Sequence, residues 1–177
     1  MYKLKVMKTF TKSFNILIVL FFTINLFNCS SNDDILEQDP NKISFNGKTY
    51  QVSGGFFEDS GNYNEFSMAL FPSGIDINTN DYTINGGNWY LEIELLTDGN
   101  TIEGTYTCGV DVFGYFIDNA QFIDDELQPG KEVFQLNKSG TLTINKVGSE
   151  YEFIYNAFDD RDIPFTSYYK GSFIERK

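Results

Sequence analysis

The sequence predicts an all-β protein, an antiparallel sandwich of two sheets with roughly 8 to 10 strands. No stretch longer than two turns carries a helical period, whereas apolar and polar residues alternate repeatedly between clusters of Gly, Asn and Asp. The 177 residues also include 18 Phe, 11 Tyr and 1 Trp, and aromatic side chains fit pleated sheets well. A lipocalin-like barrel is the alternative, because the same alternation would serve a closed sheet.

Turn signals divide the chain into short strands. Asn46-Gly47 favours a type I′ hairpin, because both central residues of that turn need positive φ. Asp98-Gly99-Asn100 joins two strands directly and predicts a second hairpin. We expect segment 108–130 to hold one strand and a long loop, and a loop of that length usually has a task. The predicted strands are residues 43–45, 49–52, 65–71, 89–97, 101–107, 131–137, 140–146, 150–158 and 165–175.

The N-terminal residues 1–28 have the layout of a secretory signal peptide, with four early lysines and an apolar core at 16–22. A membrane-spanning helix is the alternative, but it needs about 20 apolar residues and this stretch is shorter and diluted by Asn and Thr. Residues 29–41 are polar and acidic and predict a tether. Residues 42–177 are then a single all-β domain.

The end of the signal segment carries a resemblance. Leu26-Phe27-Asn28-Cys29 resembles a bacterial lipobox, and the following Ser-Ser-Asn-Asp-Asp looks like the export signal of Bacteroidota surface lipoproteins. This resemblance implies that Cys29 is diacylated on sulfur and becomes the new N-terminus. It also implies attachment to the outer membrane, facing the cell exterior, or alternatively the periplasm. Acyl chains contribute about 0.8 kcal/mol per buried CH₂, so they can hold the protein without a spanning helix.

The body of the chain carries a second, broader resemblance. It is similar to small Bacteroidota lipoproteins catalogued as domains of unknown function. The similarity implies an all-β fold and a cell-surface setting, and it supplies no catalytic residues. The segments that carry it are Phe45-Asn46-Gly47-Lys48-Thr49-Tyr50, Gly104-Thr105-Tyr106-Thr107, Ser139-Gly140-Thr141-Leu142-Thr143-Ile144 and Tyr169-Lys170-Gly171-Ser172-Phe173.

Composition excludes several functions. The chain has no histidine, which excludes Ser-His-Asp and Cys-His nucleophile systems and histidine metal ligands. Cleavage before Cys29 would remove four of 13 basic residues and none of 25 acidic ones, changing the net charge from −12 to −16. Such a charge argues against a nucleic-acid partner. The remaining cysteine, Cys108, has no basic neighbour and is predicted to be a buried, inert thiol.

Acidic residues offer the remaining routes to chemistry. Glu92 and Glu94 share one face of a strand at a spacing of about 7 Å, which suits an inverting glycosidase, but we interpret them as a solvated outer face. Segment 76–81 has oxygen ligands at alternate positions, like the opening of an EF-hand loop, but lacks the turn glycine and the closing Glu. Segments 124–126 and 159–162 are acidic clusters in predicted loops, and we interpret all three segments as solvated turns. We therefore predict no catalytic residue, no metal site and no cofactor, with a structural calcium as the alternative.

Adjacent aromatic pairs supply the candidate binding residues. In a strand each pair places one ring on either face, so Trp89 or Tyr90, and Tyr168 or Tyr169, should reach a face other than the core. Exposed rings beside polar groups suit sugar binding. The sequence thus favours a non-catalytic surface module that binds a glycan or another extracellular ligand. Alternatives are a lipocalin-like carrier of an apolar ligand and an accessory subunit of a surface complex. A carboxylate-based hydrolase is the one enzyme class left open.

Overall fold

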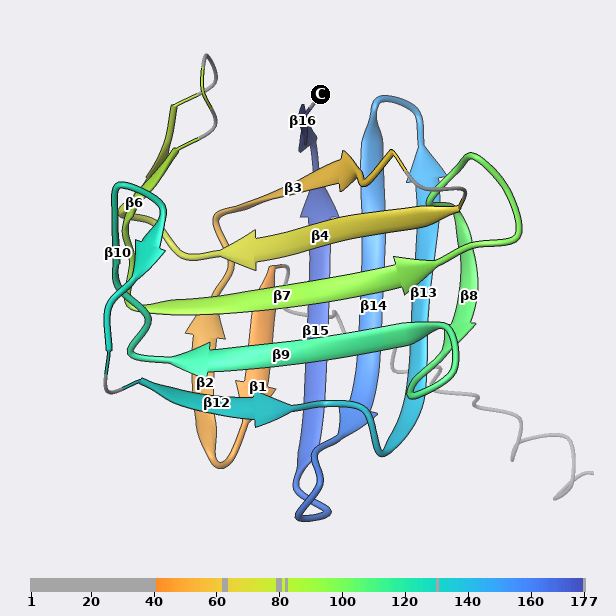
Figure 1. The fold of residues 1–177 in the computed structure, drawn as a ribbon. Helices are drawn as coiled ribbons and strands as arrows, with labels where there is room; N and C mark the ends of the chain where they lie inside the picture. The colour runs from red at the N-terminus through yellow and green to blue at the C-terminus, as the bar shows by residue number, and fades with distance from the viewer. Residues whose placement is uncertain (1–40, 62–63, 79–80, 82, 130, 177) are drawn as a thin grey trace, which may run out of the picture. The chain divides into compact units, whose positions relative to one another are not determined.

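The computed structural model describes residues 41–61, 64–78, 81, 83–129 and 131–176, and their strands form two large sheets and one small sheet (Figure 1). Residues 1–40 lie outside the described residues, and with them the predicted signal peptide, Cys29 and nearly all of the tether. In the described part of the chain, no helix has the length and apolar character that a membrane span requires.

The two large sheets make a sandwich that is not closed into a barrel, which confirms the first architecture and not the alternative. Strands of one sheet run across those of the other (Figure 1). In hydrogen-bonded order, sheet A contains β2 (Lys48–Gln51), β1 (Lys42–Phe45), β15 (Pro164–Gly171), β14 (Glu150–Phe158), β13 (Ser139–Val147) and β8 (Gly104–Thr107). Sheet B contains β12 (Glu132–Gln135), β9 (Val112–Asp118), β7 (Trp89–Leu96), β4 (Glu65–Phe71), β3 (Gly54–Asp59) and β16 (Phe173–Arg176).

A small third sheet covers one end of the outer face of sheet B. It contains β11 (Glu126–Leu127), β10 (Phe122–Ile123), β6 (Ile84–Gly86) and β5 (Ile75–Ile77). The described residues form 16 strands instead of the expected 8 to 10. The four strands of the small sheet are too short to show an alternating pattern, β3 was not predicted, and the last predicted strand is two strands. Segment 108–130 contains β9, β10 and β11 rather than one strand and a long loop.

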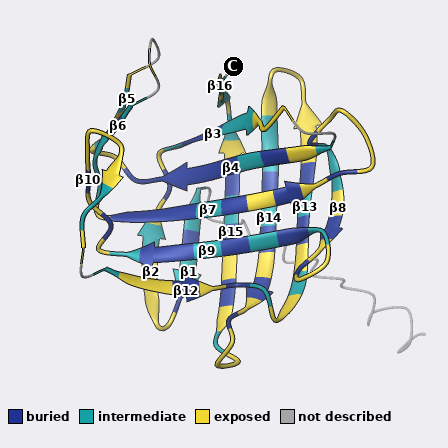
Figure 2. Ribbon diagram, viewed as in Figure 1, coloured by how far each residue is buried: buried dark blue, intermediate teal, exposed yellow. Residues whose placement is uncertain are grey.

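The main core lies between sheets A and B and is rich in rings. Phe116 contacts Phe45, Phe134 and Phe165 at ring-centre distances of 5.5, 6.5 and 5.7 Å. Tyr155 is buried among them and donates its hydroxyl hydrogen to the carbonyl oxygen of Leu136 at 3.0 Å. Buried residues alternate with more exposed ones along β13, β14 and β15, as the sequence pattern predicts (Figure 2).

The first predicted hairpin is confirmed and the second is wrong. β1 pairs with β2 around Asn46 and Gly47, whose φ values are 48° and 72°. β7 and β8, in contrast, belong to different sheets, and β8 pairs with β13. The chain after Leu96 crosses from sheet B to sheet A and buries Ile102 in the core as it does so.

The last predicted strand, 165–175, is two strands in two sheets. β15 ends at Gly171 in sheet A, and β16 begins at Phe173 in sheet B. β16 runs parallel to β3, whereas the other strand pairs of the described residues are antiparallel. The chain thus passes between the two large sheets once more at its C-terminal end.

Candidate functional site

The outer face of sheet B has a covered half and an open half. Under the small sheet lies a second apolar cluster of buried residues, namely Phe56, Ala69, Phe71, Ile84, Tyr90, Ile117, Ala120 and Phe122. Beyond that cluster, β4, β7 and β9 present their outward side chains to solvent. The strand register places Ser67, Glu94 and Phe113 in one row, and Glu92 and Tyr115 in the next row beside Ala69 of the covered cluster.

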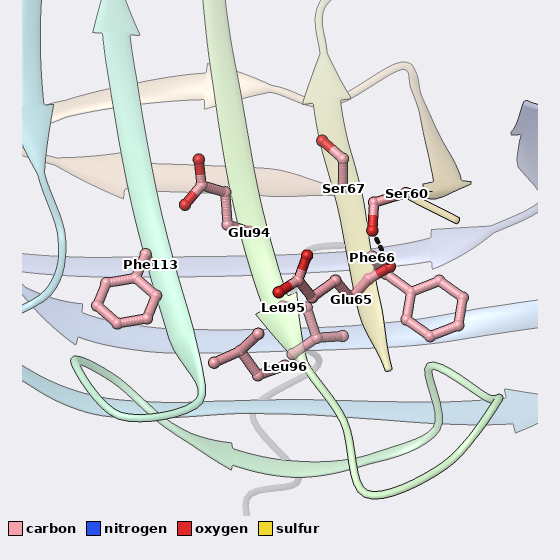
Figure 3. Close-up of a pocket in the computed structure, with 8 residues that line it drawn as sticks. All are labelled: Ser60, Glu65, Phe66, Ser67, Glu94, Leu95, Leu96 and Phe113. Carbon is pink, nitrogen blue, oxygen red and sulfur yellow. Dashed lines mark hydrogen bonds between the residues drawn. The ribbon is translucent and has the colours of Figure 1, made fainter. Parts of the chain in front are cut away.

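The open half is hollowed into a groove of about 400 Å³, which we call the outer groove. Its volume lies within the range of small-molecule sites. In Figure 3 the Glu65 and Glu94 carboxylates, the Ser67 hydroxyl and the Phe113 ring come from three adjacent strands. The lining residues are Ser60, Glu65, Phe66, Ser67, Glu94, Leu95, Leu96 and Phe113.

Two half-buried rings stand on this face outside both apolar clusters. Phe113 and Tyr115 both come from β9, and neither makes a ring contact with another described aromatic residue. Leu96, at the edge of the groove, leaves 43% of its surface exposed. Apolar surface of this kind is available to a ligand, since no described side chain of the core uses it.

The two glutamates of β7 lie on the outer face, as the alternation predicts. Glu94 is exposed and Glu92 is half-buried. Burial, and then the charge of Glu94, raise the pKa of the Glu92 carboxyl above its ordinary value. Within the described residues, no lysine or arginine forms an ion pair with either glutamate. A half-buried carboxylate without a counter-charge is a feature of ligand sites more than of stable surfaces.

The four aromatic residues predicted as binding candidates lie elsewhere. Trp89 is 2% exposed and its ring stacks on Phe116 in the main core. Tyr90 does point to the outer face, but the small sheet covers it, so it is 6% exposed and its ring lies 4.9 Å from that of Phe122. Period-2 alternation assigns a residue to a face, and it cannot tell whether another layer covers that face.

The second pair divides in the same way between core and surface. Tyr169 is buried, and its hydroxyl donates to the carbonyl oxygen of Ser172 at 2.9 Å. Tyr168 is half-buried on the outer face of sheet A, and its hydroxyl donates to the Glu152 carboxylate at 3.0 Å. Of the four predicted residues, Tyr168 alone therefore has a ring that reaches the surface, and it lies on the sheet that does not carry the outer groove.

The aspartates of the acidic segments accept backbone hydrogen bonds within or next to turns. Asp159, in the loop between β14 and β15, is 2% exposed, and its Oδ1 accepts hydrogen bonds from the Arg161 and Ile163 backbone N–H groups at 3.0 and 2.8 Å. Its Oδ2 accepts from the Arg161 guanidinium at 2.8 Å. Burial acts to raise the pKa of Asp159, but these hydrogen bonds outweigh it and the pKa is lowered. The interpretation of this segment as a solvated turn is thus wrong for Asp159, which is a buried acceptor.

The other two acidic segments behave similarly. Asp125 accepts a hydrogen bond from the Ile84 N–H at 3.0 Å and occupies, with Asp124, the turn between β10 and β11 at positive φ. Asp81 accepts from the Thr83 N–H at 3.1 Å, which lowers its pKa. Across the ranges that the structure describes, no three acidic or cysteine side chains gather closely enough to hold a metal ion.

The prediction that Cys108 is a buried thiol is confirmed. Its side chain is buried at 5% exposure in the main core and forms no disulfide. Burial raises the pKa of the thiol, and a hydrogen bond with Tyr155 only partly offsets this. A thiol in this environment is not a nucleophile at neutral pH.

Sequence reasoning missed Phe113 and Tyr115, although a signal existed. Val112, Gly114 and Phe116 alternate with them, and a strand over 112–118 would have placed both rings on one face. The turn residues around this strand obscured the pattern, so the segment was expected to be mostly loop.

Neither a scan against protein-family models nor searches of curated proteins and of solved structures found a match. The fold and the site define an all-β sandwich domain with a groove on one open sheet face.

Proposed function

We propose that this protein is a non-catalytic, lipid-anchored surface module that binds a glycan in the outer groove. One observation carries the binding part. The open half of sheet B brings an aromatic ring, carboxylates and a hydroxyl group together around a groove of about 400 Å³. Phe113, Glu94 and Ser67 supply these groups from three neighbouring strands, so a rigid sheet fixes their spacing.

The chemistry of the groove suits a sugar. The C–H face of a pyranose can stack on the Phe113 ring, which has no other ring partner among the described residues. Sugar hydroxyls donate hydrogen bonds, and the carboxylates of Glu65 and Glu94 accept them. Leu96 provides apolar surface at the edge. The groove thus combines an apolar platform with acceptors, which a polyhydroxylated ligand needs and a purely apolar one does not.

The anchor part rests on the N-terminal sequence. Leu26-Phe27-Asn28-Cys29 supports acylation of Cys29, and the acidic residues that follow support export to the outer face of the outer membrane. The acyl chains would supply the membrane attachment, because a body with this excess of acidic residues is repelled by anionic lipid. Cys29→Ser in the full chain, followed by metabolic labelling with palmitate and cell fractionation, tests this part. Labelling and membrane association that persist in the variant would contradict it.

The binding part is tested by a glycan array with the full chain. Phe113→Ala and Glu94→Gln should each weaken binding to the best glycan by about tenfold or more, which corresponds to about 1.4 kcal/mol. Two variants serve as matched controls. Phe158→Ala removes an exposed ring from the outer face of sheet A, and Glu126→Gln neutralises an exposed glutamate on the small sheet.

These controls should leave binding and thermal stability unchanged within error. An array without any bound glycan would overturn the proposed function. So would a glycan whose binding falls equally in the control variants, because the outer groove would then not be the site.

A further inference from the structure

Two further hollows adjoin the outer groove at the end of the sandwich. The second, of about 370 Å³, lies along the crossing chain between β7 and β8, and it shares Leu96 with the outer groove. The third, of about 280 Å³, opens at the end of the sandwich and shares Thr101 and Glu103 with the second. Phe66 lines both the third hollow and the outer groove. The shared residues make the three hollows neighbours at this end of the sandwich.

Aromatic rings line the outer groove and the third hollow, and the second hollow between them is mainly polar, with the buried Tyr106 as the one aromatic residue among the described residues that line it. The outer groove has the Phe113 ring, and the third hollow has the half-buried rings of Tyr151 and Phe57. The second hollow is lined largely by hydroxyl, carboxylate and backbone groups, among them Thr101 and Thr105. The crossing chain makes this arrangement, because it leaves sheet B after Leu96 instead of folding back as a hairpin.

Resting on the proposed function, we infer that the ligand is an uncharged oligosaccharide of several linked units, bound along all three hollows. Each hollow alone is near the lower limit of small-molecule sites, about 300 Å³, so none has much room beyond a small ligand. A sugar chain repeats a stackable ring face and a hydroxyl rim at every unit. It therefore matches rings at two separated positions with acceptors between them.

The charge of the lining selects against acidic sugars. Carboxylates occur in all three hollows, and Glu94, Asp98 and Asp59 represent one hollow each. Lys146 is the basic residue among those that line them, and its ammonium lies 5.3 Å from the centre of the Tyr151 ring. Uronate or sulfate groups would meet these carboxylates without an adequate counter-charge.

The test is an affinity series by calorimetry with the full chain. The probes are gluco-, manno- and xylo-oligosaccharides with β-1,4 links, from one to six units, and galacturonate oligomers of the same lengths. We expect the Kd of at least one neutral series to fall by about tenfold or more between one unit and the longest chains, as each added contact contributes. We expect galacturonate oligomers to bind at least about tenfold more weakly than the neutral series.

Variants locate the added contacts. Tyr151→Ala should raise the Kd of the long chains by a larger factor than the Kd of the short ones. Because the Tyr151 ring also packs against Phe57 and Phe173, this variant could lose stability. Thr101→Ala and Lys146→Ala change exposed side chains of the same hollows and provide the independent check. Phe158→Ala should leave the whole series unchanged.

The outcomes separate the two proposals. Binding that is independent of chain length, but is lost in Phe113→Ala, would overturn this inference and leave the proposed function standing. Tighter binding of galacturonate oligomers would also overturn it. An absence of binding for every series would overturn both.

Discussion

The carboxylate of Asp159 should stabilise the sandwich by organising the turn between β14 and β15, the central strands of sheet A. Its Oδ1 accepts two backbone hydrogen bonds, and its Oδ2 pairs with the Arg161 guanidinium at 2.7 Å. Substitution to alanine removes all of these contacts. The N–H groups of Arg161 and Ile163 then lack an acceptor, at a cost of about 1–1.5 kcal/mol each.

The Arg161 guanidinium contributes less, because 49% of the side chain is exposed and water can replace the carboxylate. We assign about 0.5 kcal/mol to that pair. Asp159→Ala should therefore lower the free energy of unfolding by about 3 kcal/mol. Asp159→Asn retains an oxygen that can accept both backbone bonds and loses only the ion pair, so it should cost about 1 kcal/mol or less.

Urea denaturation followed by tryptophan fluorescence measures these changes, because Trp89 is the single tryptophan and is buried in the main core. The control is Asp162→Asn in the same loop. Its partner is Lys138 at 2.7 Å, and 71% of the aspartate side chain is exposed, so the expected cost is about 0.5 kcal/mol or less.

The pH dependence of the free energy of unfolding provides a second test of the role of Asp159. The folded-state pKa of Asp159 lies below its unfolded value, so its contribution is present above the ordinary aspartate range and is lost as pH falls through the folded pKa. The stability difference between the natural chain and Asp159→Ala should shrink in acid. Equal losses in Asp159→Ala and Asp162→Asn would refute this reasoning.

Three further predictions concern buried or crowded positions. Glu92→Gln should raise the free energy of unfolding at pH 7 by up to about 1 kcal/mol, because the raised pKa of Glu92 makes its ionisation in the folded state costly. At pH values below the ordinary glutamate pKa the substitution should have no such effect, since the carboxyl is then protonated. A variant less stable than the natural chain at pH 7 would contradict this. Gly114→Ala should cost about 1–3 kcal/mol in urea denaturation, since the added Cβ would meet the Tyr155 side chain; an unchanged midpoint would contradict this contact. Cys108 should react with iodoacetamide in urea and not in the native protein, and native labelling seen by peptide mass analysis would contradict its burial.

The long strands of the fold could be predicted from the sequence because one of their faces is buried. Leu91, Ile93 and Leu95 alternate with polar residues along β7, and all three are in the main core. The Asn46-Gly47 turn fixed the first hairpin for a local reason, its positive φ angles. Both signals lie within a few neighbouring residues.

The groove could not be predicted, because it depends on contacts between distant segments. Tyr90 and Glu92 lie on the same face of β7 by the alternating pattern. Tyr90 is nevertheless buried under β10, whereas Glu92 is only half-buried. The difference comes from Phe122, more than 25 residues further along the chain. Phe113 became recognisable as a binding candidate only once β9 was seen beside β7.

The parallel pairing of β16 with β3 has a consequence for the order of assembly. Phe173 and Gly55 are partners although they lie near opposite ends of the domain. The edge of β3 therefore has no partner until almost the whole chain is available, and closing so long a loop makes folding slow. Under the export proposed above, this delay would help to keep the chain unfolded until it has crossed the membrane, because sheet B is completed only when β16 pairs with β3.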